Sequence, residues 1–304
     1  MNQNTHNSPM LAKFEWPTWL LIVFVYGAWL GLLAGYHMLG GALAGAGLVF
    51  VLALHGSVQH ELIHRHPTRY IWLNTLLAIP PLSLLYPYPV YRDSHIAHHN
   101  NENLTLPGID PESFYVTRAE WERAGAVKRA YYTFNMTILG RLATGPAVSL
   151  VHLIKIMFAD LRLGTQARKL MWVSHIVAIA AVLWVVSVMF EVPLWYYLLI
   201  AYMGNSLSML RSFYEHRADE NPDFRSTINE GCMLSRFLFL NNNYHYLHHK
   251  HPHEPWYRLP ALYARERESL LQENGQFLVC GYQRWLLESF IKPIDSPIHP
   301  FARE

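Results

Sequence analysis

The sequence predicts an all-α integral membrane protein: four transmembrane helices in two hairpins, with a helical cap that holds a histidine-rich site for two metal ions. Three observations predict this fold. Of the 304 residues, 52% are hydrophobic and only 15% are charged, whereas soluble domains carry about 25% charged residues. Uncharged apolar runs long enough to cross a bilayer recur along the chain. Eight of the 18 histidines fall into three short groups.

The first hairpin is predicted to consist of spans at 17–38 and 42–59, neither of which contains a charged residue. A helix rises about 1.5 Å per residue, so roughly 20 residues cross a hydrocarbon core of roughly 30 Å. Gly40 and Gly41 interrupt the helix between the two spans. The next apolar run, 71–85, is short and broken by two prolines, which indicates a re-entrant or interfacial segment.

The second hairpin is predicted to consist of spans at 170–190 and 193–210. Before it, the segment 131–163 carries Arg141 and Lys155 within apolar stretches. That pattern favours amphipathic helices that lie at the membrane interface. The chain is then a single domain, 1–304, whose cap is formed by 60–169 and 211–304.

The basic residues give the expected orientation. All 24 Lys and Arg residues lie outside the predicted connections 39–41 and 191–192. Because an excess of positive charge marks the cytoplasmic side, we expect both termini and all three histidine groups to be cytoplasmic, in a bacterial cytoplasmic membrane. The chain has no Lys/Arg-rich run typical of nucleic-acid binding, so nucleic acid is not an expected partner.

The three histidine groups are spaced as metal ligands on helices. They are His60-x3-His64, His95-x2-His98-His99 and His245-x2-His248-His249. Residues at i, i+3 and i+4 share one helix face, so we expect each group to converge on a single point. Neutral imidazole is a good ligand for iron, zinc and copper.

These three boxes, in this order and spacing, resemble those of the membrane-bound fatty acid desaturase and hydroxylase superfamily, which are non-haem di-iron enzymes. After the third box, the segment from Pro255 to Pro260 is similar to the Pro-Trp-Tyr-Arg-Leu-Pro segment of bacterial lipid desaturases. The resemblance implies two iron ions held by the eight box histidines. It also implies a ninth ligand upstream of the third box, for which His216 is the candidate.

Several polar residues near the boxes are candidates for supporting roles. Some relatives carry an asparagine four residues before the ninth histidine; here that position is Ser212, and Asn205 and Asn241 to Asn243 are possible substitutes. Carboxylates usually orient metal-bound imidazoles. Those near the boxes in sequence are Asp93, Glu102, Asp110, Glu112, Glu215 and Asp219.

The resemblance implies oxidation of an unactivated alkyl chain by dioxygen, a step that only a cofactor can carry. Desaturation of a fatty acid or acyl lipid is the leading expectation. The same scaffold serves a hydroxylase or ketolase of an alkyl chain or carotenoid, and a fatty acid decarboxylase that forms a terminal alkene. The chain has no segment typical of a fused cytochrome or an iron–sulfur protein, so we expect a separate electron donor: a ferredoxin, a rubredoxin or a cytochrome.

Two rival hypotheses belong to other classes of protein. His60-Glu61-x-x-His64 also matches the zinc metalloprotease motif, with Glu61 as the general base, although a protease needs one further ligand and not two more boxes. A membrane receptor or scaffold stabilised by zinc would have closed, structural coordination and would consume no oxygen.

Overall fold

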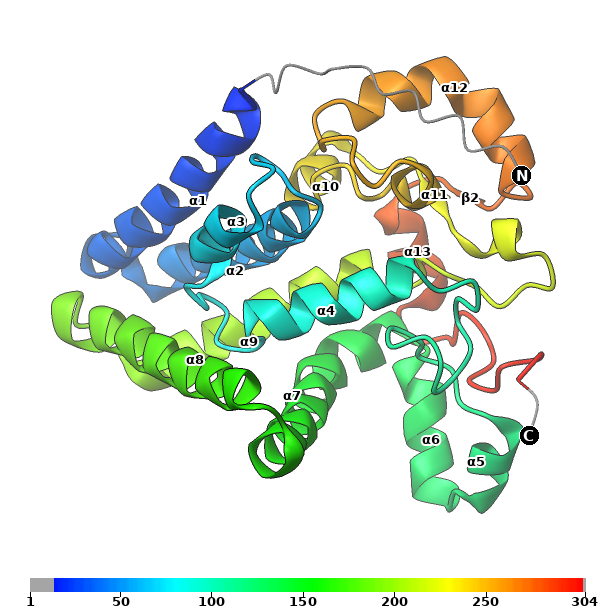
Figure 1. Cartoon of the computed structure of the whole chain (residues 1–304), viewed down its shortest axis with the longest axis horizontal. Coiled ribbons are helices and arrows are strands. Elements are labelled where there is room, and N and C mark those ends of the chain that lie inside the picture. Colours follow the sequence, from blue (N-terminus) through cyan, green and yellow to red (C-terminus); the bar gives the residue numbers. More distant parts are fainter. Residues whose placement is uncertain (1–13, 303–304) are drawn as a thin grey trace.

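The computed structural model describes residues 14–302 of a helical protein in which the longest helices gather on one side. The first two, α1 (Trp16–Ala34) and α2 (Tyr36–Ile63), pack side by side (Figure 1). The backbone leaves the helical conformation at Gly40, with φ 76° and ψ 155°. This region of φ favours glycine. The predicted interruption at Gly40 is therefore present, but it is a kink inside α2, and the chain passes from α1 to α2 at Gly35.

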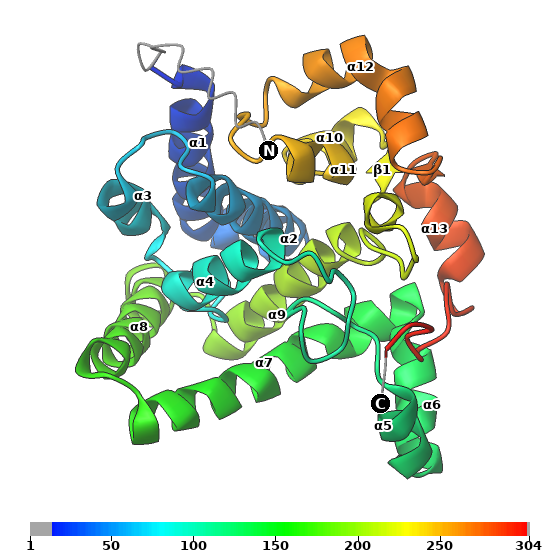
Figure 2. The same cartoon turned by 45° about the vertical axis from the view of Figure 1, so that its right-hand side comes forward.

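A second group of long helices lies against the first. It contains α7 (Ile138–Leu163), α8 (Gln166–Trp184), which continues into the π-helix η1 (Val185–Met189), and α9 (Leu194–Arg211). Helix α9 packs against both α2 and α7, and it runs between α4 and α7 in Figure 2.

Shorter elements complete the chain. Those at its C-terminal end lie on the side opposite α8 (Figure 1). The short two-stranded sheet is parallel, with Ile228 beside Leu278 and Asn229 beside Val279. The shorter elements are α3 (Ile71–Ala78), α4 (Tyr88–His99), α5 (Arg118–Arg123), α6 (Ala126–Asn135), η2 (Pro222–Arg225), β1 (Ile228–Asn229), α10 (Met233–Leu238), α11 (His245–Lys250), α12 (Leu259–Glu273), β2 (Leu278–Val279) and α13 (Tyr282–Ser289).

Four helices of the described chain are long and apolar enough to cross a membrane, as the sequence predicted in number. They are α1, α2, α7 and the continuous segment Gln166–Met189. Three of them coincide with predicted spans, but the fourth differs. Helix α7, expected to be interfacial, is among the four because its 26 residues include only three basic residues and one acidic residue. Helix α9, expected to span, is not among them.

Several polar residues make α9 less apolar, and their side chains form hydrogen bonds within the bundle. Asn205 donates to the carbonyl oxygens of Ser83 (2.9 Å) and Ala201 (2.8 Å), and Ser206 donates to that of Leu142 (2.8 Å). The Tyr197 hydroxyl donates to the carbonyl of Leu82 and accepts from the Trp29 indole. Because buried polar groups must be paired, these bonds fix α9 in the centre of the bundle.

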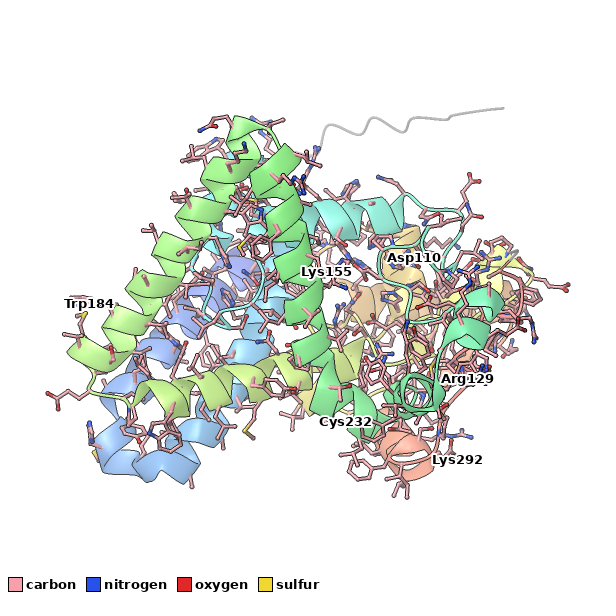
Figure 3. All side chains as sticks on the ribbon, turned by 90° about the horizontal axis from the view of Figure 1, so that it is seen from below. Asp110, Arg129, Lys155, Trp184, Cys232 and Lys292 are labelled. Atoms are coloured by element: carbon pink, nitrogen blue, oxygen red, sulfur yellow. The ribbon has the colours of Figure 1, made fainter. Side chains whose placement is uncertain are left out.

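The surface divides into an apolar end and a polar end. Figure 3 shows Trp184 at one extremity and Asp110, Arg129 and Lys292 towards the other. Trp184 is 55% exposed, and large apolar side chains are exposed along α1, α7, α8 and α9. Soluble proteins rarely expose so much contiguous apolar surface, which agrees with a bilayer around these helices.

Candidate metal centre

Nine histidines from distant parts of the chain come together in two groups. The first cluster contains His60, His64, His95, His99 and His248, and the second contains His98, His216, His245 and His249. Within each cluster, the possible ligand atoms all lie within 4.8 Å of one another. All eight box histidines and His216 are therefore brought together, from α2, α4, the segment after α9, and α11.

The second and third boxes are each divided between the two clusters, so the expectation that each converges on a single point is wrong. Box two gives His95 and His99 to the first cluster and His98 to the second. Box three gives His248 to the first cluster and His245 and His249 to the second. The cause is helix geometry: at about 100° per residue, positions i and i+4 differ by about 40°, whereas i+3 and i+4 differ by about 100°. The histidines of one box can therefore reach two neighbouring metal positions.

The spacing of the imidazole nitrogens fits bound metal ions. A metal–imidazole bond of about 2.1 Å places two ligands at right angles about 3.0 Å apart. The Nε2 atoms of several ligand pairs lie at this separation, at 3.1 Å for His64 and His95, 3.1 Å for His99 and His248, 2.9 Å for His98 and His216, and 2.9 Å for His216 and His245. His60 Nε2 is buried without a hydrogen-bond partner among the described residues, as expected of an atom that binds a metal.

Burial keeps most of these imidazoles in the neutral form that binds metals. It holds the pKa values of His245, His248 and His249 well below their ordinary value, and the neighbouring histidines lower them further. Burial, followed by the charge of His98, lowers the pKa of His216 to about 3. Because only the neutral ring offers a lone pair, these four histidines can bind metal ions without first losing protons.

Three of the six candidate carboxylates contact the clustered histidines. Asp110 Oδ1 accepts from His98 Nδ1 at 2.8 Å, and Glu112 Oε1 accepts from His95 Nδ1 at 3.0 Å. Burial would lower the pKa of His98, but Glu112 and Asp110 together raise it above its ordinary value. Each bond leaves the Nε2 atom of the same ring free to bind a metal.

The third carboxylate, Glu215, lies 3.5 Å from His245 Nδ1 and 3.6 Å from Arg211 Nη1. Sequence reasoning missed Arg211, although its i, i+4 spacing with Glu215 at the end of an apolar run is a signal for such a pair. The remaining candidates lie elsewhere: Asp93 pairs with Arg92 and Arg168, Asp219 pairs with Arg217, and Glu102 is exposed.

The proposed substitutes for a ligand asparagine have other partners. Asn205 is bonded within the bundle, as described above. Asn241 donates to the carbonyl of Trp256 at 2.9 Å, Asn243 donates to that of Asn229, and Asn242 lies 3.4 Å from Glu215. Ser212 caps the C-terminus of α9.

The environment of Glu61 does not fit a protease. Its carboxylate accepts the backbone N–H of Trp256 at 3.2 Å, and it is not part of either cluster. A general base must reach the water bound to the metal. Glu61 instead forms a hydrogen bond that links the segment after box three to α2. His60 and His64 also share their cluster with three more histidines, which exceeds the ligand set of a protease zinc site.

Comparison with known families agrees with this arrangement. The sequence model of the fatty acid desaturase family matches residues 36–279, which includes all nine clustered histidines and the carboxylates that contact them. No curated protein matches the chain.

Proposed function

This chain belongs to the fatty acid desaturase family, and we propose that it is a di-iron enzyme that desaturates the alkyl chain of a fatty acid or acyl lipid with dioxygen. The observation that carries the proposal is the convergence of nine histidines into two adjacent clusters. A donor set made only of imidazole, with a membrane-facing apolar surface beside it, suits iron and oxygen chemistry on a lipid.

The residues of this chain have distinct roles in that reaction. The first cluster would hold one iron and the second would hold the other; when bound, the two irons supply the activation of dioxygen and the removal of hydrogen from the alkyl chain. Asp110 and Glu112 orient His98 and His95 through their Nδ1 atoms. The burial of the clusters, with His98 fully inaccessible and His248 2% exposed, excludes bulk water from the site.

Two electrons are required for each turnover, and we propose that a separate ferredoxin, rubredoxin or cytochrome delivers them. The cap segments 60–169 and 211–304 carry 23 of the 24 Lys and Arg residues, and positive surface charge steers a partner of opposite charge.

Expression in a bacterial host of known lipid composition, followed by lipid mass spectrometry, tests the reaction. We expect lipids lighter by two hydrogen atoms per chain, and none in cells that carry the His248→Ala variant. A product heavier by one oxygen atom would indicate hydroxylation instead. Loss of the carboxyl group with a terminal alkene would indicate decarboxylation. Either result would contradict desaturation but would still agree with a metal site that carries out oxidation.

We further propose that the clusters face the cytoplasm and that α9, not α7, is the fourth span. Arg141, in the first turn of α7, lies over Phe114, and Arg168, in the first turn of α8 just after α7, pairs with Asp93 of α4 at 3.4 Å. The start of α7 and the connection that follows it therefore both contact the part of the chain that carries the histidine clusters, which favours α7 lying along the membrane. In this arrangement the basic residues around Gly164 stay on the positively charged side.

Labelling of cysteines by a maleimide that does not cross membranes tests this topology. The only two cysteines, Cys232 and Cys280, are free and exposed, and we expect them to react only from the cytoplasmic side. In a Cys232→Ser/Cys280→Ser background, Met38→Cys should react only from the outside. Leu163, at the end of α7, is 83% exposed, and Leu163→Cys should react only from the inside. Reaction of Leu163→Cys from the outside would make α7 a span.

A further inference from the structure

Arg141 is a cationic side chain with two buried nitrogen atoms that lack a partner among the described residues. Its Nε and Nη2 atoms are buried, and neither has a hydrogen-bond partner among residues 14–302. Its guanidinium lies over the ring of Phe114, 4.8 Å from the ring centroid. Arg141 is half-buried as a whole. Burying two guanidinium nitrogens without a counter-ion is costly, and arginine presents a planar fork of donors that matches a carboxylate or phosphate. The two free nitrogens therefore indicate an anion that is absent from the chain itself.

The surroundings of Arg141 connect it to the metal centre by two routes. Phe114 follows Glu112 by two residues, and Glu112 is bonded to the cluster ligand His95; the Cα atoms of Glu112 and Phe114 can be at most roughly 7 Å apart. On the other side, Arg141 lies beside Gly145, where a Cβ would collide with Met209 of α9. Helix α9 leads directly to the ligand His216.

Apolar surface adjoins the cation. Arg141 occupies the first turn of α7, and Val148 (45% exposed) lies two turns further along the same helix face, with Val151 (53% exposed) one turn beyond it. A polar head beside an apolar strip is the surface that an amphiphile matches: its anionic end can pair with the guanidinium while its chain remains on the apolar side.

We propose that Arg141 binds the anionic head group, a carboxylate or a phosphate, of the alkyl-chain substrate and thereby positions that chain for oxidation. This inference rests on the proposed function, and it narrows the substrate class to anionic amphiphiles. A neutral alkane or carotenoid would leave the buried guanidinium unpaired. Arg141 is thus a binding residue for the head of the substrate, while the histidine clusters act on its chain.

Arg129 provides a matched control. It also lies over an aromatic ring, with its guanidinium 5.7 Å from the Trp121 centroid. Its nitrogens, however, are satisfied by the protein: Nε donates to the carbonyl of Trp121 at 2.9 Å and Nη2 to that of Glu122 at 2.8 Å. Figure 3 labels Arg129 at the polar end of the molecule. Arg129→Met removes the same charge and stacking as Arg141→Met without removing a free anion site.

Equilibrium binding to the purified full chain in a neutral detergent, with no electron donor present, tests the proposal without turnover. The probes are palmitate against hexadecanol, and dipalmitoyl phosphatidate against dipalmitoylglycerol. We expect the wild-type protein to prefer one anionic probe over its neutral partner by about tenfold or more, and the preferred pair identifies the head group as carboxylate or phosphate. Arg141→Met should lose this preference, whereas Arg141→Lys should retain part of it and Arg129→Met all of it.

Equal wild-type affinity for the charged and neutral probes would overturn the proposal, and this comparison does not depend on whether any variant folds. Retention of the preference in Arg141→Met would also overturn it. With the oxidised lipid as substrate, Arg141→Met should raise KM by about tenfold or more and change the saturated rate by no more than about twofold. If Arg141→Met loses anion binding but keeps the wild-type KM, the site binds a lipid that is not the substrate, and the proposal is overturned. If the proposed oxidation fails but the anion preference depends on Arg141, the binding site stands and the reaction does not.

Discussion

Replacing His248 with Ala is expected to abolish oxidation, with a loss of more than about a hundredfold, and to lower the iron content from two towards one per chain. His248 is 2% exposed, and its Nε2 lies 3.1 Å from that of His99 in the first cluster. Even the loss of a residue that only orients a ligand costs about 10–100-fold in metal affinity or activity, so the loss of a ligand should cost more. Iron analysis and lipid mass spectrometry of the purified variant measure both effects.

Two further variants make this test specific to each cluster. His98→Ala should remove the iron of the second cluster and leave that of the first, because His98 belongs only to the second. His253→Ala is the control: this histidine is exposed, follows box three and lies outside both clusters. Full activity with two irons in His248→Ala would remove that residue from the ligand set. Equal iron loss in His253→Ala would show that the effect is not one of ligation.

Replacing Asp110 with Ala is expected to weaken iron binding at the second cluster by about 10–100-fold. Asp110 is 4% exposed, and one of its oxygens accepts from His98 Nδ1 at 2.8 Å. The carboxylate also accepts the backbone N–H groups of Thr105 (2.8 Å) and Glu112 (3.0 Å), so its removal frees both the ligand and the loop that carries Glu112. Titration of the purified protein with Fe²⁺ under anaerobic conditions measures the affinity.

Asp93→Ala is the matched control for this experiment. Asp93 is also a carboxylate near box two, but it pairs with Arg92 and Arg168 at the surface. Surface ion pairs contribute little, about 0–1 kcal/mol, and we expect its iron affinity to match that of the wild type. Asp110→Asn keeps a carbonyl oxygen that can accept from His98, and it should lose less than Asp110→Ala. Equal affinities for Asp110→Ala and Asp93→Ala would refute the orienting role of Asp110.

The sequence was sufficient to predict the long helices and the histidine groups, because both signals are local. An apolar run and an i, i+3, i+4 spacing can each be read within a short window. His216 came from resemblance, since a single histidine has no periodic signal. The division of boxes two and three between the clusters depends on the position of one helix relative to another, which no local pattern contains.

Tertiary contacts also decided which carboxylates matter. Asp93 is closer in sequence to box two than Asp110 is, yet Asp110 reaches His98 because its loop folds back over α4. The polar residues of α9 likewise lower its apolar character while they pair with carbonyl groups of neighbouring segments. Composition alone therefore ranks α9 below α7 as a span, although α9 is the more enclosed of the two by its packing against α2 and α7.

Because α2 is uninterrupted after Gly40, it fixes the distance between its apolar segment and the first histidine cluster. One helix carries both this segment and His60, so each residue inserted between them would shift this histidine by about 1.5 Å and turn it by about 100°. Insertions and deletions in that stretch should therefore be eliminated during evolution, while substitutions that keep its apolar character can accumulate. Variation in chain length is left to the connections between helices, and an engineer who shortens or lengthens this protein should work there.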